Sequence, residues 1–476
     1  MKEKSDIGLI GLGVMGASLA LNMESKGFRV SVYNYIPEVT DKFMDGPGKG
    51  RKFVGAHSYE ELIGSLDAPR KVFLMVTAGA AVDQVLGQIV PLLDKGDVVI
   101  DGGNSHFSDT ENRASSLEDK GIMYVGCGVS GGEEGALKGP SMMPGGPAAA
   151  WPLLKSIFQK MAATAPDGHP CCDWIGPCGS GHFVKMVHNG IEYGDIQLIC
   201  ECYQIMRDGL GKSNPEMQAV FAEWNKGELD SYLIGITADI LGKKETDGQY
   251  VLDLILDAAG QKGTGKWTVI SALESGVPLP LISEAVFARC LSAARDERLA
   301  AAGTLPGPTL AVMPEHFTVM PDLIGHLEHA LYAAKIISYA QGFALLRVAA
   351  AERGWPLDYG RIAGLWCGGC IIRSAFLGRI REAYERKPDL ENLMLDPYFA
   401  GQLAEAQASL RLVVAAAAQA GIPIPALSSA LAYYDGYRCP RLGANLLQAQ
   451  RDYFGAHTYE RTDRPRGEFH HTDWQK

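Results

Sequence analysis

The chain has 476 residues, of which 47% are hydrophobic and 21% charged, and this balance excludes a disordered or low-complexity protein. Its length predicts two or three domains, because a domain usually has about 100–200 residues. The formal net charge of −11 and the lack of a basic run argue against a nucleic-acid binder.

Short apolar runs alternate with helical stretches over residues 5–130. The runs that predict strands are 7–10, 30–33, 72–76, 98–100 and 123–126. This alternation predicts a mainly parallel, doubly wound sheet, which is an α/β architecture of the Rossmann type. We assign this dinucleotide-binding domain to residues 1–178.

Helical periodicity and abundant alanine replace this pattern after residue 178. The segments that predict helices are 181–209, 215–242, 248–258, 283–302, 323–352, 370–386 and 400–420. We therefore expect one large all-helical domain over residues 179–438. The remaining residues, 439–476, are rich in Arg, Gly, Pro and His and predict a tail that cannot bury itself alone.

The first motif is a complete GxGxxG over residues 11–16, between the first strand and the first helix. Its glycines allow a tight turn, a close approach of pyrophosphate to the backbone, and close packing of helix on strand. The helix N-terminus then faces the phosphates. The pattern alone is weak and is also compatible with a structural turn, but its position favours dinucleotide binding.

The residue that follows the second strand bears on the choice between NAD and NADP. An acidic side chain there would hold the ribose 2′-hydroxyl of NAD, but this chain has Asn34. A neutral amide does not repel a 2′-phosphate, so NADP is allowed. NAD is not excluded, because no Arg follows at Tyr35 or Ile36.

The densest group of functional side chains is Lys185, His188, Asn189, Glu192 and Tyr193. Their spacing of i, i+3, i+4, i+7 and i+8 places them on one face of a helix. Such a stripe suits a substrate cleft. The alternative is a solvated face with inert charges, but exposed faces are usually poorer in His, Asn and Tyr.

Three glycine-containing segments add possible anion contacts. Residues 129–136 form a glycine turn whose successive N–H groups could make an anion nest. Residues 101–105 end a strand at the edge where α/β sheets bind ligands. Residues 261–267 read as a basic, glycine-interrupted loop that suits a phosphate but lacks the spacing of a P-loop.

Together these segments resemble the decarboxylating 6-phosphogluconate dehydrogenase family, and the resemblance covers nearly the whole chain. The segments that carry it are 11–16, 101–105, 128–136, 185–193, 260–267, 284–290 and 450–458. The resemblance implies NADP-dependent oxidation of 6-phosphogluconate at C3, followed by loss of CO2 to give ribulose 5-phosphate. In this reaction of the pentose phosphate pathway, Lys185 would be the base and Glu192 the acid.

The resemblance also implies binding residues and a homodimer. The substrate would contact Asn104, Ser130, Gly131, Gly132, His188, Asn189, Tyr193, Lys262, Thr264, Arg289, Arg451 and His457. The cofactor would contact Gly11, Leu12, Gly13, Val14, Met15, Gly16, Asn34, Val76, Ala78 and Asn104. Arg451 and His457 would reach the partner's site through the tail, and no metal is expected.

This chemistry requires two shifted pKa values. A free lysine has a pKa of about 10.4, whereas a base works best near neutral pH. Burial could lower the pKa of Lys185, and so could a neighbouring cation such as the imidazolium or Lys262. The pKa of Glu192 should be raised, because the carboxyl must be protonated when it donates.

The chain departs from the family pattern at three places. Tyr35 and Ile36 stand where Arg followed by Thr or Ser is usual, and Thr77 replaces a common Lys. Cys367 stands where Arg or Lys is usual and forms a CxxC with Cys370. Without a second pair at zinc spacing, unpaired thiols are a better interpretation than a zinc or redox motif.

Two other functions fit part of the pattern: a shorter β-hydroxyacid dehydrogenase, and a catalytically inactive nucleotide sensor. The large helical region and the phosphate-binding candidates argue against the first. The presence of both Lys185 and Glu192 argues against the second.

The ten cysteines do not form a secreted disulfide framework, and the first residues do not read as a signal peptide. The uncharged stretch 412–434 is broken by 421–425, which leaves too few apolar residues to span a membrane. We therefore expect a cytoplasmic protein that binds no membrane.

Overall fold

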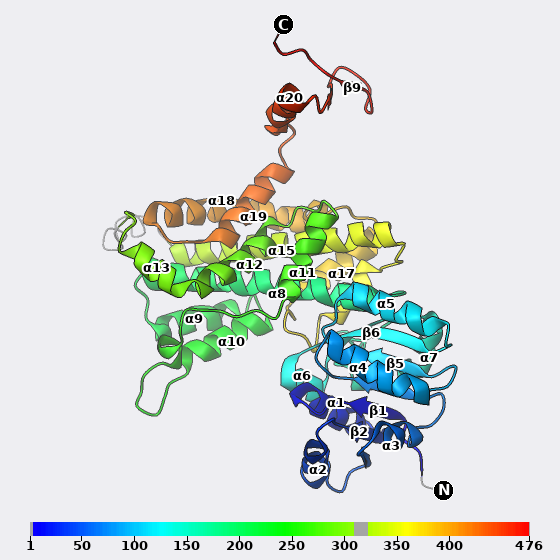
Figure 1. Cartoon of the computed structure of the whole chain (residues 1–476). Helices are drawn as coiled ribbons and strands as arrows, with labels where there is room; N and C mark the ends of the chain where they lie inside the picture. The colour runs from blue at the N-terminus through cyan, green and yellow to red at the C-terminus, as the bar shows by residue number, and fades with distance from the viewer. Residues whose placement is uncertain (1–2, 309–321, 476) are drawn as a thin grey trace.

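A sheet domain, a helical body and a projecting C-terminal tail follow one another along the chain (Figure 1). The computed structural model describes residues 3–308 and 322–475. Residues 1–2, 309–321 and 476 lie outside this description, and the second of these ranges belongs to the expected helical domain.

The N-terminal part contains a seven-stranded sheet in the order β3-β2-β1-β4-β5-β6-β7. The strands are β1 (Ile7–Ile10), β2 (Val30–Tyr33), β3 (Phe53–Ala56), β4 (Lys71–Leu74), β5 (Val98–Asp101), β6 (Met123–Ser130) and β7 (Ser141–Gly145). All pairs are parallel except β6 with β7. This confirms the doubly wound sheet, but the sequence reading missed β3 and β7, whose glycines and Pro144 weaken the strand signal.

Helices cover both faces of this sheet. They are α1 (Val14–Ser25), α2 (Pro37–Asp45), α3 (Tyr59–Gly64), α4 (Ala80–Ile89), α5 (Phe107–Glu118), α6 (Gly132–Lys138) and α7 (Trp151–Met161), with 3₁₀ turns at Val90–Leu92 and Ala148–Ala150. Apolar side chains of α1, α2 and α7 join one buried cluster, and those of α3, α4 and α5 join another. The sheet therefore has a core on each face, as the continuous apolar runs of its strands predicted.

The helical body follows from residue 180. Its helices are α8 (Ser180–Gln204), α9 (Asn214–Trp224), α10 (Tyr232–Gly242), α11 (Thr264–Glu274), α12 (Pro280–Ala293), α13 (Arg295–Ala302), α15 (Leu323–Arg353), α16 (Tyr359–Leu365), α17 (Leu377–Arg386), α18 (Pro397–Ala420) and α19 (Pro425–Tyr437). A π-helical turn at Ile205–Gly209 extends α8, and 3₁₀ turns lie at Val251–Leu254 and Leu393–Leu395. The structure thus confirms that this region is built from helices.

Four of the expected helices were wrong in part. The segments 215–242 and 283–302 are each two helices, and 248–258 contains only a short 3₁₀ turn. Leu254, Ile255 and Leu256 are exposed, so among the described residues no core contact stabilises a helix there. The first residues of 370–386 are not helical, because their backbone bonds to residues 230–232 instead.

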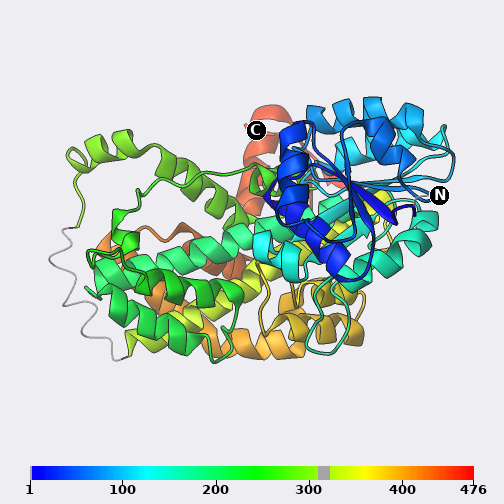
Figure 2. The ribbon, with the colours of Figure 1, turned by 90° about the horizontal axis from the view of Figure 1, so that it is seen from below.

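The two longest described helices, α8 and α15, pack against each other in the centre of the body. Glycines allow the close approach: a Cβ at Gly342 would lie 2.5 Å from Ile191 Cδ1, and one at Gly194 would lie 2.4 Å from Ser338 Oγ. The first turns of α8 also pack against β6 and β7. The residues around 185–193 therefore lie where the sheet domain meets the helical body (Figure 2).

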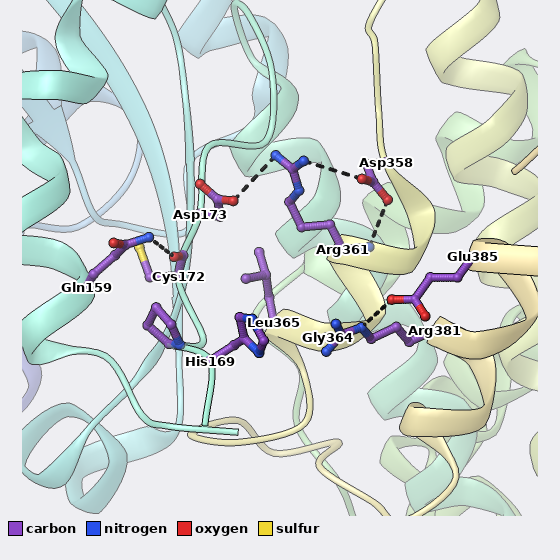
Figure 3. Close-up of a pocket in the computed structure, with 11 residues that line it drawn as sticks. Gln159, His169, Cys172, Asp173, Asp358, Arg361, Gly364, Leu365, Arg381 and Glu385 are labelled. Atoms are coloured by element: carbon purple, nitrogen blue, oxygen red, sulfur yellow. Dashed lines mark hydrogen bonds and ion pairs between the residues drawn. The ribbon is translucent and has the colours of Figure 1, made fainter. Parts of the chain in front are cut away.

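Ion pairs cross this junction. Arg361 of α16 lies 3.4 Å from Asp173, and Arg353 of α15 lies 3.0 Å from Glu111 of α5. Figure 3 shows Arg361 beside a pocket of about 320 Å³. Its lining is Gln159, His169, Pro170, Cys172, Asp173, Asp358, Arg361, Gly364, Leu365, Arg381 and Glu385. None of the expected site residues lines this pocket.

The tail contains α20 (Ala444–Gly455) and a small hairpin of β8 (Tyr459–Glu460) and β9 (Phe469–His470), and it stands away from the body (Figure 1). Asp452 accepts hydrogen bonds from the backbone of Thr458 and Thr472 and from the Trp474 indole. The apolar side chains of Leu446 and Phe454 are exposed. The tail therefore has local order but buries little of its own apolar surface.

Among the described helices, none is both long and apolar enough to cross a membrane. The uncharged stretch 412–434 is divided between α18 and α19, with Gly421 in the left-handed region at the end of α18. This break is where the sequence placed it.

Candidate active site

The GxGxxG turn lies at the carboxyl end of β1, beside the point where the strand order reverses between β1 and β4. Gly11 has a φ of +101°, and a Cβ there would lie 2.4 Å from the Met75 carbonyl oxygen. A Cβ at Gly16 would lie 1.9 Å from the Gly11 carbonyl oxygen, whereas Gly13 has open space around it. Gly13 precedes Val14, the first residue of α1, so the turn fits the pyrophosphate of a dinucleotide.

Asn34 holds this turn in place. It follows β2, is buried, and its Oδ1 accepts a hydrogen bond of 3.1 Å from the Leu12 backbone N–H. The next side chain, Tyr35, is 77% exposed. The other expected cofactor residues follow neighbouring strands: Val76 and Ala78 after β4, and Asn104 after β5. All of them therefore share the carboxyl edge of the sheet.

The polar stripe of α8 is largely buried, so its interpretation as a solvated face is wrong. Lys185 is only 6% exposed, and His188, Asn189 and Tyr193 are also buried. The side chain of Glu192 is 22% exposed. Buried polar side chains need partners, which this stripe finds within itself and on β6.

A chain of contacts orients these side chains. His188 Nε2 lies 3.3 Å from Ser130 Oγ, and His188 Nδ1 lies 3.1 Å from Asn189 Oδ1. A neutral imidazole with its proton on Nδ1 satisfies both, since it donates to the amide oxygen and accepts from the hydroxyl. Lys185 Nζ lies 3.4 Å from His188 Nδ1 and Glu192 Oε2 lies 3.9 Å from it. The Lys185 amine and the Glu192 carboxyl therefore both lie close to the same ring nitrogen of His188.

The pKa of Lys185 is lowered by burial, against the opposing charge of Glu192. Burial and the nearby Lys185 also place the pKa of His188 well below its usual value, so His188 is not the cation that shifts Lys185. Lys262 is exposed. Of the causes that the sequence left open, burial is the one present in the structure.

The pKa of Glu192 is raised, first by burial and further by Asp195, while Lys185 and Arg289 oppose the shift. The direction favours a protonated carboxyl, as an acid requires. The pKa of Lys185 is thus lowered and that of Glu192 raised, which brings each group closer to the range in which a base or an acid works near neutral pH.

Helix α11 carries phosphate-binding candidates to α8. Thr268 Oγ1 donates 2.8 Å to the Met186 carbonyl oxygen. A Cβ at Gly265 would lie 2.4 Å from the Tyr193 ring, so only glycine permits this approach. Because α11 begins at Thr264, the expectation of a loop over 261–267 was wrong for its second half. Lys262 lies in the turn just before the helix.

Arg289, on α12, places its guanidinium carbon 3.5 Å from the centre of the Tyr193 ring. Gly131 and Gly132, after β6, have positive φ values of 119° and 62°. A Cβ at Gly131 would lie 2.5 Å from the Gly369 carbonyl oxygen, so the glycine lets this turn pack beside the helical body.

A cavity joins three expected residues, Asn104, Lys185 and Thr264. The other residues that line it are Ser105, His182, Met186 and Trp267. Ser105, Met186 and Trp267 lie within segments that the sequence singled out, but they were assigned no role. Ser105 and Trp267 could have been predicted, because each is the last residue of an identified segment. The buried position of His182 had no sequence signal.

Arg451 and His457 are not brought to this cavity. Both are exposed on the tail, where Arg451 Nη1 donates 3.1 Å to Gln448 Oε1. The tail stands away from the body in Figure 1, so these residues do not join the site of their own chain.

The CxxC pair is a pair of free thiols at the end of α16, and none of the ten cysteines forms a disulfide. Cys367 donates to the Ala363 carbonyl oxygen and Cys370 to that of Trp366. Burial raises the pKa of Cys367 to about 11 and that of Cys370 to about 12, so both are protonated. Over the described residues, no three His, Cys, Asp or Glu side chains gather as metal ligands would.

Comparison with known proteins gives matches along the whole chain. A family model described as the NAD binding domain of 6-phosphogluconate dehydrogenase matches residues 6–176. A second, described as the C-terminal domain of 6-phosphogluconate dehydrogenase, matches residues 181–474.

Decarboxylating 6-phosphogluconate dehydrogenases of Haemophilus influenzae and Mus musculus are each 56% identical to the chain. The alignments cover 100% and 99% of this chain and 97% of each relative. A solved structure of 6-phosphogluconate dehydrogenase from Plasmodium falciparum matches with a TM-score of 0.92 at 45% identity, covering 98% of this chain and 100% of that chain. Its description includes the apo form and complexes with its cofactor NADP+ and its substrate 6-phosphogluconate.

Proposed function

Since the chain belongs to the 6-phosphogluconate dehydrogenase family, we propose that it oxidises 6-phosphogluconate with Lys185 as base and completes the decarboxylation with Glu192 as acid. The products are ribulose 5-phosphate, CO2 and reduced NADP. The observation that carries the proposed roles is the buried Lys185, with its lowered pKa, in a cavity shared with Asn104 and Thr264. The test is formation of reduced nicotinamide, followed by absorbance, with 6-phosphogluconate and either NADP or NAD.

The first step removes two hydrogens, one from the C3 hydroxyl and one from C3 itself. Neutral Lys185 accepts the proton of the C3 hydroxyl while C3 loses a hydride, which leaves a 3-keto acid. When bound on the glycine turn and the carboxyl edge of the sheet, NADP supplies the hydride acceptor. Burial serves this step, because it makes neutral Lys185 accessible nearer to neutral pH.

The second step breaks the bond between C1 and C2. Lys185, now an ammonium, donates a hydrogen bond to the C3 carbonyl oxygen and stabilises the electron pair that CO2 leaves behind. The resulting enediol then takes a proton from Glu192 at the carbon that becomes C1 of the product. The raised pKa of Glu192 favours its protonated form beforehand.

The remaining residues hold the substrate in this scheme. Asn104, Ser130, Gly131, Gly132, His188 and Asn189 contact the sugar acid, and Tyr193, Lys262, Thr264 and Arg289 contact its phosphate. Arginine suits the phosphate because its planar fork makes two parallel hydrogen bonds. Contact between Arg289 and the Tyr193 ring supports their placement in one subsite.

The alternatives are less well supported. A shorter β-hydroxyacid dehydrogenase would not account for the match of a 6-phosphogluconate dehydrogenase model to residues 181–474. An inactive sensor would not need a buried lysine and a carboxyl with pKa values displaced toward each other.

We also propose the domain limits 1–178, 179–438 and 439–476, and a homodimer in which each tail reaches the partner's site. The exposed apolar side chains of the tail support this exchange, since they lack cover within their own chain. The proposed location is the cytoplasm. The ten unpaired cysteines are in keeping with a reducing compartment.

The variant Arg451→Ala tests whether the tail binds the substrate phosphate in the partner's site. Loss of a charged phosphate contact typically costs about 2–5 kcal/mol, so the Michaelis constant for 6-phosphogluconate should rise at least about thirtyfold. Mixed dimers of an Arg451→Ala subunit and a Lys185→Met subunit should regain one intact site. Arg438→Ala, on an exposed side chain before the tail, is the control and should leave the constant unchanged. No regain of activity in verified mixed dimers would place the tail in its own subunit's site.

The exposed Tyr35 predicts weaker discrimination between NADP and NAD than in enzymes with an Arg at this position. Tyr35→Arg should raise the ratio of kcat/KM for NADP over NAD about ten- to a hundredfold, because a charge-assisted bond to the 2′-phosphate contributes about 1.5–3 kcal/mol. The change should lie in the Michaelis constant for NADP and leave kcat alone. Strong NADP preference of the wild type would show that another cation already binds the phosphate.

A further inference from the structure

A buried carboxylate and a buried guanidinium lie near the carboxyl edge of the sheet. Asp101 is the last residue of β5, and Arg113 is on α5. Both are buried, with Arg113 Nη1 lying 3.6 Å from Asp101 Oδ2. Burial of such a pair is unfavourable unless further hydrogen bonds hold both charges. Those bonds lead to three parts of the proposed site.

Asp101 fixes the loop that carries Asn104. Its carboxylate accepts hydrogen bonds from the Gly103 backbone N–H at 3.0 Å and from Ser105 Oγ at 2.6 Å. Tyr124 donates a third bond of 3.0 Å. Both chain neighbours of Asn104 are thus tied to one buried carboxylate.

Arg113 fixes the loop that follows β4. Its Nη2 donates 3.1 Å to the carbonyl oxygen of Gly79, which directly follows Ala78 and precedes α4. The Nε and Nη2 atoms bind the two carboxylate oxygens of Asp83 at 2.7 and 3.2 Å. The rigid fork of arginine can hold the carbonyl and the carboxylate together, which a lysine cannot do.

The Asp101–Arg113 pair is also connected to α8, the helix that carries Lys185. His182, one turn before Lys185 on α8, places Nε2 3.1 Å from the Asp101 carbonyl oxygen. Its Nδ1 lies 2.6 Å from Thr110 Oγ1 on α5. The loop after β4 therefore bonds to Arg113, and the Asn104 loop bonds to the Asp101 carboxylate. Helix α8 bonds to the Asp101 backbone through His182.

We propose that Arg113, acting with Asp101, is a positioning residue: it holds the cofactor loop after β4 in register with the Asn104 loop and α8. This role rests on the proposed function, in which the first loop holds NADP and the other two elements hold the substrate. Arg113 touches neither ligand and acts only through the loops it joins.

Arg113→Lys is the test, since it keeps the charge and removes the fork. Arg70→Lys is the matched control: Arg70 also binds two carboxylates, Asp94 and Asp97, but precedes β4 at the opposite edge of the sheet. Hydrogen exchange of the ligand-free protein should become about tenfold faster at residues 76–80 and 103–106 in Arg113→Lys. Exchange at these residues should not change in the control.

Cofactor binding gives the second readout. The dissociation constant for NADP, measured by fluorescence without substrate, should rise about tenfold in Arg113→Lys, and kcat should fall. The Michaelis constant for 6-phosphogluconate should rise as well, because Asn104 lies in the loosened segment 103–106. Asp83→Asn weakens the same fork from an exposed residue, and it should give the same pattern at smaller amplitude if Arg113→Lys does not fold.

Unchanged loop exchange and unchanged NADP affinity in a folded variant would overturn the role of Arg113. The same losses in Arg70→Lys would overturn it too, because they would reflect general destabilisation. Failure of the wild type to oxidise 6-phosphogluconate would refute the proposed function instead, since exchange and NADP binding do not depend on that substrate.

Discussion

Lys185→Met is expected to lower the turnover of 6-phosphogluconate by about three orders of magnitude or more, because one general base alone contributes about 10²–10⁴-fold. The proposed mechanism uses Lys185 twice: its neutral form takes the hydroxyl proton, and its ammonium then stabilises the electrons left by CO2. Methionine has a similar length and no titratable group. The variant should therefore keep the packing of the cavity and lose both steps.

Binding of NADP should survive this change, because the glycine turn lies between β1 and α1 and not on α8. The measurements are steady-state turnover and the NADP dissociation constant in the same preparation. Lys138→Met is the control for the chemical change, since Lys138 is exposed and pairs with Glu134 on α6. Turnover within about tenfold of wild type would show that Lys185 is not the base.

The order of strands and helices could be predicted from the sequence where one pattern of apolar residues, typical of either a strand or a helix, dominated a segment. Apolar runs predicted five of the strands, and long periodic stretches predicted α8, α15 and α18. The strands β3 and β7 escaped because each is short and carries glycine, and β7 also carries Pro144. The segment 248–258 failed for another reason: its apolar residues suggested a buried face, yet they are exposed in the chain.

The shared face of the candidate residues on α8 could be predicted, because one helix carries them at fixed spacing. Contacts between distant segments could not. Gly265 against the Tyr193 ring, and Arg113 between Gly79 and Asp101, join residues that lie far apart along the chain. A pattern within one segment carries no information about contacts with a distant segment. For the same reason, the sequence allowed several causes for the lowered pKa of Lys185, whereas the structure identifies burial.

Glu192→Gln is expected to lower turnover about 10²–10⁴-fold, because glutamine keeps the shape of the acid and cannot give up a proton. The enediol then has to take its proton from water. In D2O, ribulose 5-phosphate from the wild type should carry deuterium at C1 with one configuration, whereas the variant's product should carry both. Glu134→Gln, an exposed change on α6, is the control and should behave as the wild type.

The same variant has a pH signature whose sign follows from the charges. Where Glu192 is ionised, its carboxylate raises the pKa of Lys185; glutamine carries no charge, so the pKa of Lys185 falls further in the variant. Lys185 must be neutral to accept the hydroxyl proton. Activity therefore rises with pH as the Lys185 ammonium is deprotonated. The rising limb of the residual oxidation should therefore move to lower pH in Glu192→Gln. A higher Michaelis constant with unchanged kcat, product configuration and pH profile would show instead that Glu192 only binds the substrate, since loss of a proton donor must alter the step after CO2 leaves.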